Sequence, residues 1–467
     1  MSNITTIRSE VEKFMEREQL SLSDLGRKTG LNVGTLSSIF TGGRVMSVNQ
    51  LDRITSLMRL PEGHFYELYI HQENMAATQP NWRRLRPFIF RCAELNKLDC
   101  IRYVTGWMLD NIVYCPVLFD AAEDLLWEEK KEAAAILYES VAITENSQHS
   151  ERLALCQYRL FTIRLGEDQA QNLQVAAQFE PYVERLDEVT QLDALKDLAN
   201  VYRFLRGWDK MDKFAEMMGN RARRHYFAET RKKRSGEDLY SKLSRPLFVY
   251  ISYSDLLRGE VCHELEEYAQ ALQFIFNYSD LSWVKENDAE ALRWKDLFQE
   301  WAKTNMYVTK LFSGDLSVLS EYIAYIDTQK DDILLSLLNI AKLANQFHIN
   351  VDETFEHFGP EILLLLEAED LPGIHNKRLN AERLTRLLSE LSEYYLRKGE
   401  IQAGFKYLLN SLAKSAAINH DSNIVKCVGL FEYFRDYADF ETQLKYQKLF
   451  KEVYQNEKNN RPARNRR

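Results

Sequence analysis

Glycine and proline are both scarce in this chain, with 18 glycines and 9 prolines among 467 residues. Because these two residues interrupt regular helices, their scarcity excludes collagen-like and proline-rich chains and favours long helices with short connections. Good helix formers such as leucine, glutamate, alanine and lysine are plentiful instead. The chain is also too long for one compact core. We therefore expect an all-α protein that contains at least two domains, or one domain followed by a repeat array.

Long apolar runs are absent as well. The most apolar stretch, Ile362–Leu366 with its neighbours, is far shorter than the roughly 20 residues that span a bilayer, so we expect no membrane segment. Six cysteines are scattered without a Cys-x-x-Cys pair, and no secretion signal precedes them. This pattern predicts a reduced, cytoplasmic protein.

Motifs for catalysis are missing from the sequence. It contains no phosphate-binding loop, no His-Glu-x-x-His, no Gly-x-Ser-x-Gly and no spaced pairs of metal ligands. Cys262 and His263 are adjacent but lack a second pair at the spacing of a metal site. We therefore expect neither an enzyme nor a cofactor or metal site.

An excess of positive charge is also absent, since the net charge is −9. Residues 1–70 carry eight basic and eight acidic side chains. Any binding of nucleic acid must therefore depend on where individual charges are placed.

The most informative stretch is SLSDLGRKTGLNVGTLSSIFTGGR, residues 21–44. Ser21 or Ser23 is suited to cap a helix that runs through Lys28, and Asn32 can cap a second helix over 33–40. Gly30 supplies the reversal between the two helices. The segment therefore predicts two short helices joined by a turn.

Further spacings make this segment typical of a helix-turn-helix. Gly26 stands where the two helices must approach closely, while Leu36 and Ile39 face the core. An amphipathic helix is expected over 4–18, a fourth helix after a Ser47 cap, and a fifth that opens at Pro61. Together they predict a domain over residues 1–71 that resembles the Cro/C1-type (Xre-like) helix-turn-helix, and TGLNVGTLSSIFTGGR carries the resemblance. The alternative is an ordinary helical hairpin that binds nothing.

In a helix-turn-helix the start of the second helix reaches the base edges of double-stranded DNA. The residues predicted to lie there are Val33, Gly34, Thr35, Ser37 and Ser38. None can make a bidentate base contact, so one copy should read bases weakly and a homodimer on a two-fold operator is expected. The residues predicted to contact phosphates are Arg27, Lys28, Asn32 and Arg44, and Arg53 is a further candidate.

After a polar linker predicted over 72–81, the remaining chain shows internal repeats. The clearest copy, LLSELSEYYLRKGEIQAGFKYLLNSLAKSA, has the large, small and aromatic offsets of a tetratricopeptide repeat, with Gly399 at its turn. Weaker copies bring the total to eight or nine helix pairs. We therefore predict an α-solenoid of degenerate tetratricopeptide repeats over 82–457, followed by a basic, disordered tail over 458–467.

The inner wall of such an array is a candidate peptide site, because amide side chains both donate to and accept from a peptide backbone. Projection of the repeat register places six polar residues on or near the inner face of a first helix. They are Asn200, Arg203, Tyr253, Asn305, Asn339 and Lys342.

An Xre-like helix-turn-helix followed by degenerate tetratricopeptide repeats resembles the peptide-pheromone receptors of Gram-positive bacteria, the Rap/Rgg/NprR/PlcR/PrgX family. The resemblance implies a cytoplasmic transcription regulator in quorum sensing. Its affinity for DNA would change when a short imported oligopeptide binds in the groove of the repeats. It also implies a homodimer formed through the repeat domain. In the family, asparagines on inner helices clamp the peptide backbone, and Asn200 and Asn339 occupy the equivalent places here.

Two other functions remain open. One is a repeat scaffold that binds a protein partner and whose helix-turn-helix is only structural; the other is a bifunctional regulator that also sequesters or dephosphorylates a signalling protein. A basic run from Arg221 to Arg234 could contact phosphate or an acidic partner, or form a solvated helix end and loop.

Overall fold

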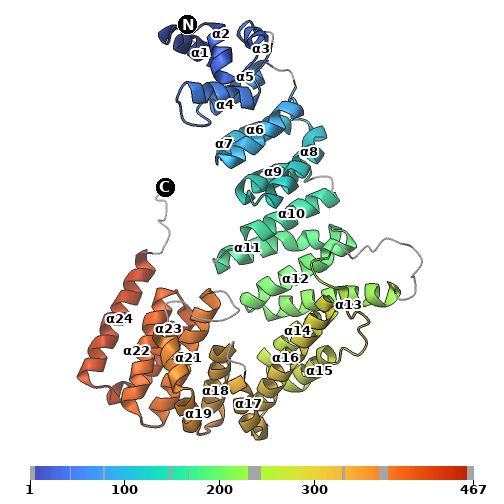
Figure 1. Ribbon diagram of the computed structural model, residues 1–467. Coiled ribbons are helices and arrows are strands. Elements are labelled where there is room, and N and C mark those ends of the chain that lie inside the picture. The colour runs from blue at the N-terminus through green and yellow to red at the C-terminus, as the bar shows by residue number, and fades with distance from the viewer. Residues whose placement is uncertain are drawn as a thin grey trace. The chain divides into compact units, whose positions relative to one another are not determined.

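The computed structural model describes residues 6–42, 44–76, 79–146, 150–166, 168–229, 243–328, 332–367 and 377–459. Within these ranges the chain forms 24 α-helices and no strand (Figure 1). The expectation of an all-α protein is confirmed. None of the described helices combines the length and the apolar character that crossing a membrane requires. The chain divides into two compact units, residues 1–245 and 246–467.

The first unit has thirteen α-helices in its described ranges. They are α1 (Ile7–Arg17), α2 (Leu22–Thr29), α3 (Val33–Phe40), α4 (Val48–Leu57), α5 (Tyr66–Ala76), α6 (Trp82–Glu94), α7 (Leu98–Met108), α8 (Cys115–Trp127), α9 (Lys131–Thr144), α10 (Glu151–Arg164), α11 (Gln169–Phe179), α12 (Glu188–Phe204) and α13 (Trp208–Glu229). Short 3-10 segments precede α8 and α12, at Ile112–Tyr114 and Glu180–Arg185.

Two details at the end of the N-terminal bundle differ from the sequence-based expectation. Pro61 does not open a helix, because residues 62–65 form turns and α5 begins only at Tyr66. The same helix then extends to Ala76, so the predicted linker is helical over 72–76. Tyr69 and Ile70 are buried and anchor this helix.

One hydrophobic core connects the N-terminal bundle with the helices that follow it. Buried side chains form a continuous cluster that runs in sequence from Ile7 to Leu160. Within it α4 packs on α6, and α5 packs on α7. Phe88 of α6 lies against the rings of Tyr66 and Tyr69 of α5, with ring centroids 5.0 and 5.2 Å apart. The bundle is therefore attached to α6 and α7 by packed side chains.

The second unit has eleven α-helices in its described ranges. They are α14 (Leu247–Glu264), α15 (Tyr268–Ser279), α16 (Ala289–Phe312), α17 (Leu319–Thr328), α18 (Ile333–Phe347), α19 (Asp352–His357), α20 (Gly359–Glu367), α21 (Lys377–Arg397), α22 (Ile401–Ala417), α23 (Asp421–Phe434) and α24 (Phe440–Asn459). Residues 458 and 459 of the predicted tail belong to α24, and the rest of that tail lies outside the described residues.

Successive helices from α6 onward pack in pairs joined by tight turns. The helices within the pairs α8–α9, α12–α13, α14–α15 and α21–α22 pack on each other. Each of these four turns contains one residue with positive φ: Glu129 (60°), Arg206 (53°), Glu266 (61°) and Gly399 (86°). A left-handed residue just past a helix ends it and reverses the chain. The same local device therefore recurs along both units.

Candidate functional site

Local interactions fix both ends of α2. The Ser21 hydroxyl accepts a hydrogen bond from the Asp24 backbone N–H (3.1 Å), and the Asp24 carboxylate accepts one from the Ser21 N–H (3.2 Å). The Ser21 hydroxyl also donates to the Asp24 carboxylate (2.6 Å), and this bond, together with the one from the Ser21 N–H, holds the pKa of Asp24 below its usual value. Gly30 ends α2 with φ of +68°, a conformation that glycine adopts without steric cost. The predicted cap and turn are confirmed.

Gly26 marks the point where α2 and α3 approach most closely. A Cβ at this position would lie 2.9 Å from the Leu31 carbonyl oxygen and 3.0 Å from Cγ2 of Val33. The first neighbour is backbone and cannot move aside without disturbing the turn. The sequence-based reason for glycine at this position is therefore confirmed.

The start of α3 presents a capped and exposed face. The Asn32 side-chain oxygen accepts hydrogen bonds from the N–H groups of Gly34 (2.8 Å) and Thr35 (3.3 Å). On the opposite side Leu36 and Ile39 are buried in the core. The face turned away from the core offers Asn32, Gly34 and Ser37 as exposed residues and Val33 at 40% exposure, while Thr35 and Ser38 are half-buried.

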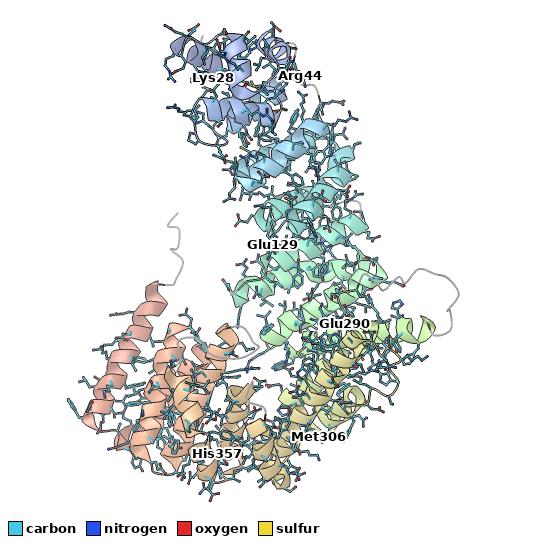
Figure 2. The ribbon with its side chains drawn as sticks, in the orientation of Figure 1. Lys28, Arg44, Glu129, Glu290, Met306 and His357 are labelled. Atoms are coloured by element: carbon cyan, nitrogen blue, oxygen red, sulfur yellow. The ribbon has the colours of Figure 1, made fainter. Side chains whose placement is uncertain are left out.

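Three basic residues predicted to contact phosphates precede and follow α3 in the sequence. Arg27, Lys28 and Arg44 are exposed, and Figure 2 labels the last two in the N-terminal bundle. Arg27 forms an ion pair with Asp24 on its own helix at 2.7 Å, with its side chain 77% exposed. An exposed pair at i,i+3 contributes little and exchanges readily with another anion. Arg27 can therefore still contact a phosphate.

Two arginines hold α3 and its turn in place: Arg8, for which no role is predicted, and Arg53, the further candidate for a phosphate contact. The Arg8 guanidinium donates to the Ile39 carbonyl (3.0 Å), where a cation is favourable near a helix C-terminus. Arg53 reaches the Gly30 carbonyl at the turn (3.4 Å). Neither contact has a local signal, because the bonded residues lie 31 and 23 positions apart.

A polar cluster ties the N-terminal bundle to α6. The Tyr66 hydroxyl donates to one carboxylate oxygen of Asp52 (2.8 Å), and Arg91 Nε donates to the other (3.1 Å). Arg91 also pairs with Glu94 (2.6 Å) and Glu62 (3.2 Å). Burial and the neighbouring carboxylate raise the pKa of Tyr66, so its phenol stays protonated and donates. This joint between α4, α5 and α6 was not expected from the sequence.

The six residues predicted for peptide binding lie on α12, α14, α16 and α18. Asn200 and Arg203 belong to the first unit, are half-buried on α12 and already interact with other residues. The other four belong to the second unit, where Tyr253 on α14 is half-buried and also has a partner.

In the second unit the predicted asparagines lie beside buried tyrosines of the preceding helix. Asn305 donates to the Tyr278 hydroxyl at 2.9 Å. Burial raises the pKa of the Tyr322 hydroxyl to about 12, and the nearby Ser336 and Asn339 oppose this rise. Both asparagines are half-buried, so each has one side facing the protein. Asn305 thus uses part of its hydrogen-bonding capacity within the protein.

Lys342 lies near His263, a histidine for which no role is predicted from the sequence. His263 of α14 is mostly buried, and burial together with the Lys342 ammonium lowers its pKa. Its Nδ1 lies 3.3 Å from the Thr309 hydroxyl of α16. These contacts bring α14, α16 and α18 together at one place. In the described part of the chain, no group of three potential ligands is placed to hold a metal ion.

The basic run is only partly described. Arg221 is mostly buried and pairs with Glu184 at 2.6 Å, and it also donates to Gln191. It therefore stabilises the packing of α13 on the segment before it and is not available to an external phosphate. Residues 230–234 lie outside the described residues.

Comparison with known protein families finds no family model that matches this chain, and comparison with curated proteins finds no match either.

Proposed function

We propose that this protein is a transcription regulator that binds double-stranded DNA through a helix-turn-helix formed by α2 and α3. The observation that carries the proposal is the start of α3, which is capped by Asn32, exposed, and flanked by Arg27, Lys28 and Arg44. The close approach at Gly26 and the left-handed turn at Gly30 give the compact crossing that a helix-turn-helix requires. Phosphate contacts would set the register on the duplex.

The residues on this face favour a homodimer. Ser37 and Thr35 can form single hydrogen bonds to bases, and Val33 can contact a thymine methyl. Because none of them is bidentate, one copy would discriminate weakly between base pairs. Two copies on a two-fold operator double the contacts and the specificity.

We further propose that the helix pairs after the bundle form a tetratricopeptide-like array that binds a short signalling oligopeptide. The recurring left-handed turns support this, and so does Gly404, where a Cβ would lie 2.5 Å from Cγ of Leu396. A small residue at this contact between paired helices is part of the repeat pattern. Peptide binding would favour one arrangement of the array and so change the affinity for DNA.

The DNA-binding part of the proposal can be tested with the full chain and with operators selected from random duplexes. Neutralising Arg27, Lys28 and Arg44 together should weaken binding and reduce the salt dependence of the affinity, because each lost phosphate contact lowers the slope by about 1. Arg17→Ala, an exposed arginine on α1, serves as the matched control. Unchanged DNA affinity in the triple variant would favour a scaffold whose helix-turn-helix is only structural.

The peptide-binding part of the proposal is tested by using the full chain to capture short peptides and then repeating the DNA titration in the presence of each one. Ser37→Ala should change DNA binding without changing peptide affinity, and Asn339→Ala should do the reverse. Absence of any peptide that alters DNA affinity would contradict the regulatory part of the proposal and leave the DNA-binding part standing.

A further inference from the structure

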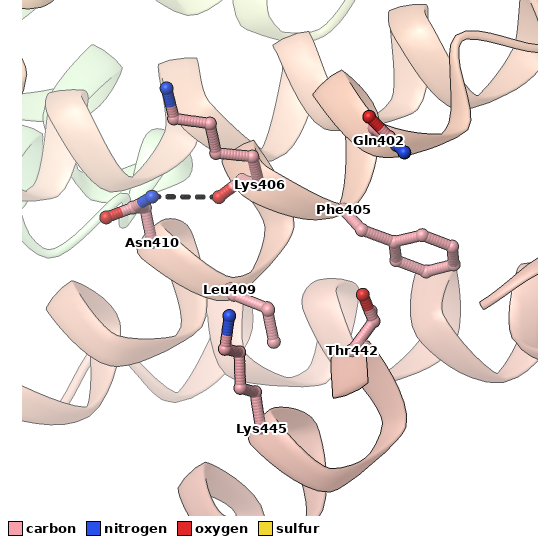
Figure 3. Close-up of a pocket in the computed structure, with 7 residues that line it drawn as sticks. All are labelled: Gln402, Phe405, Lys406, Leu409, Asn410, Thr442 and Lys445. Carbon is pink, nitrogen blue, oxygen red and sulfur yellow. Dashed lines mark hydrogen bonds between the residues drawn. The ribbon is translucent and has the colours of Figure 1, made fainter. Parts of the chain in front are cut away.

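A hollow of about 360 Å³ lies between α22 and α24 in the second unit (Figure 3). None of the residues predicted for DNA or peptide binding lines it. The lining residues are Gln402, Phe405, Lys406, Leu409 and Asn410 of α22 and Thr442 and Lys445 of α24.

The hollow has an apolar floor and a polar rim. Phe405 is buried and Leu409 is partly buried, and both belong to the core formed by the last helices. Gln402, Lys406 and Asn410 are four residues apart, so they form one line along α22. Figure 3 shows Lys445 rising from α24 towards Leu409. The surface thus combines apolar contact with a row of hydrogen-bond donors.

The charge at this hollow is positive. Helix α22 contains Lys406 and Lys414 but neither aspartate nor glutamate. Within the described part of the chain, the Lys406 ammonium has no carboxylate partner. Lys445 pairs with Glu441 on its own helix at 2.6 Å, and both side chains are well exposed. Such an exposed pair contributes little to stability, so a carboxylate from another molecule can compete for Lys445.

The amides on the rim are suited to a peptide backbone. Asn410 Nδ2 donates to the Lys406 carbonyl (2.8 Å), which leaves its side-chain oxygen as an acceptor. Gln402 is exposed and offers both a donor and an acceptor. Two apolar side chains of α24, Phe440 at 82% and Leu444 at 57% exposure, add uncovered apolar surface on the same helix as Lys445. A partner that combines negative charge with apolar side chains complements this surface.

We propose that the hollow between α22 and α24 binds an extended peptide segment in which acidic and apolar side chains alternate. The carboxylates would lie against Lys406 and Lys445, and an apolar side chain would cover Phe405 and Leu409. Gln402 and Asn410 would hydrogen-bond the peptide backbone. Charge complementarity at the rim gives specificity, and the floor removes apolar surface from water. This site does not depend on the DNA-binding proposal.

The test uses the full chain, free of DNA, and a fluorescein-labelled octapeptide of alternating glutamate and leucine. Fluorescence anisotropy should show saturable binding that weakens as salt is added. Lys406→Glu should lower the affinity on the order of tenfold, because it replaces an attraction by a repulsion at the rim. Lys406→Arg keeps the positive charge and should bind the peptide nearly as tightly as the wild type. Lys451→Glu, an exposed lysine on α24 outside the hollow, is the matched control and should leave the affinity unchanged.

Two further measurements test whether the apolar floor contributes to binding and whether each variant remains folded. Leu409→Ala should weaken binding without changing its salt dependence, and circular dichroism should show that each variant keeps its helices. The proposal is overturned if a peptide with glutamine in place of glutamate binds equally well, or if Lys406→Glu binds like the wild type. Displacement of the peptide by inorganic phosphate at equal concentration would also overturn it, because the hollow would then be a general anion site. None of these outcomes bears on operator binding.

Discussion

At the scale of single residues, the carboxylate of Glu123 connects three helices of the first unit through a bidentate ion pair and a hydrogen bond. Arg159 of α10 donates through Nε and Nη2 to the two carboxylate oxygens of Glu123 on α8, both at 2.9 Å. The Tyr138 hydroxyl of α9 donates to the same carboxylate at 2.6 Å. Burial alone would raise the pKa of Glu123, but the hydrogen bonds from Arg159 and Tyr138 outweigh it and the pKa is lowered. The ionised carboxylate is therefore the form that stabilises the fold.

This pair predicts a pH-dependent loss of stability. Because the folded pKa lies below the unfolded value, Glu123 contributes stability above about pH 4.5 and loses it as the pH falls through the folded pKa. Glu123→Gln should therefore lower the free energy of unfolding at pH 7 by about 1 kcal/mol and by less at pH 3.5, as measured by urea titration. Glu128→Gln, at the exposed end of α8, should change little at either pH. An equal loss at both pH values would contradict the assignment.

The sequence predicted those residues whose role depends on local geometry. Gly26, Gly30 and Asn32 could be assigned because a close approach, a left-handed turn and a cap are each decided within about ten residues. Asp52 and Arg91 could not, because they are 39 positions apart and meet only when α4 packs on α6. The hydrogen bond from Asn305 to Tyr278 likewise depends on the packing of α16 on α15. Helix periodicity alone therefore placed asparagines on a face but could not show which of them already have a partner.

At the scale of elements, the joint between the N-terminal bundle and α6 determines how the bundle is held. Tyr66, Tyr69 and Phe88 supply its apolar part, and Arg91 supplies its polar part. A bundle fixed by packed helices transmits a displacement of α6 more directly than one attached by a flexible chain. Under the proposed function, control of DNA binding through this joint would involve a change in the position of α4 and α5.

Removal of the Arg91 side chain should loosen this joint. Arg91→Ala deletes the cation that pairs with Asp52, Glu62 and Glu94, and leaves a half-buried carboxylate at Asp52 held by Tyr66 alone. A loss of about 1–2 kcal/mol is expected, so amides of α5 should exchange with deuterium roughly tenfold faster. Arg83→Ala, an exposed arginine on the same helix, should leave this exchange unchanged. If α5 keeps its full protection in Arg91→Ala, aromatic packing alone holds the joint.

At the scale of the whole molecule, the chain consists of two compact units with buried cores of their own. Leu137 lies fully buried in the cluster of the first unit, and Leu388 lies fully buried in a cluster of the second. In a chain of helix pairs, each pair is stabilised mainly by its neighbours in sequence. A defect in one unit should therefore destabilise nearby helices more than distant ones.

Two core variants test whether the units unfold separately. Leu137→Ala and Leu388→Ala should each cost about 2–5 kcal/mol, the usual loss when a buried leucine becomes a cavity. Hydrogen exchange followed at increasing denaturant should show that Leu137→Ala exposes α8–α10 at lower denaturant and leaves α21–α23 unchanged, and that Leu388→Ala does the opposite. If either variant shifts all helices together, the 467 residues unfold as one cooperative body.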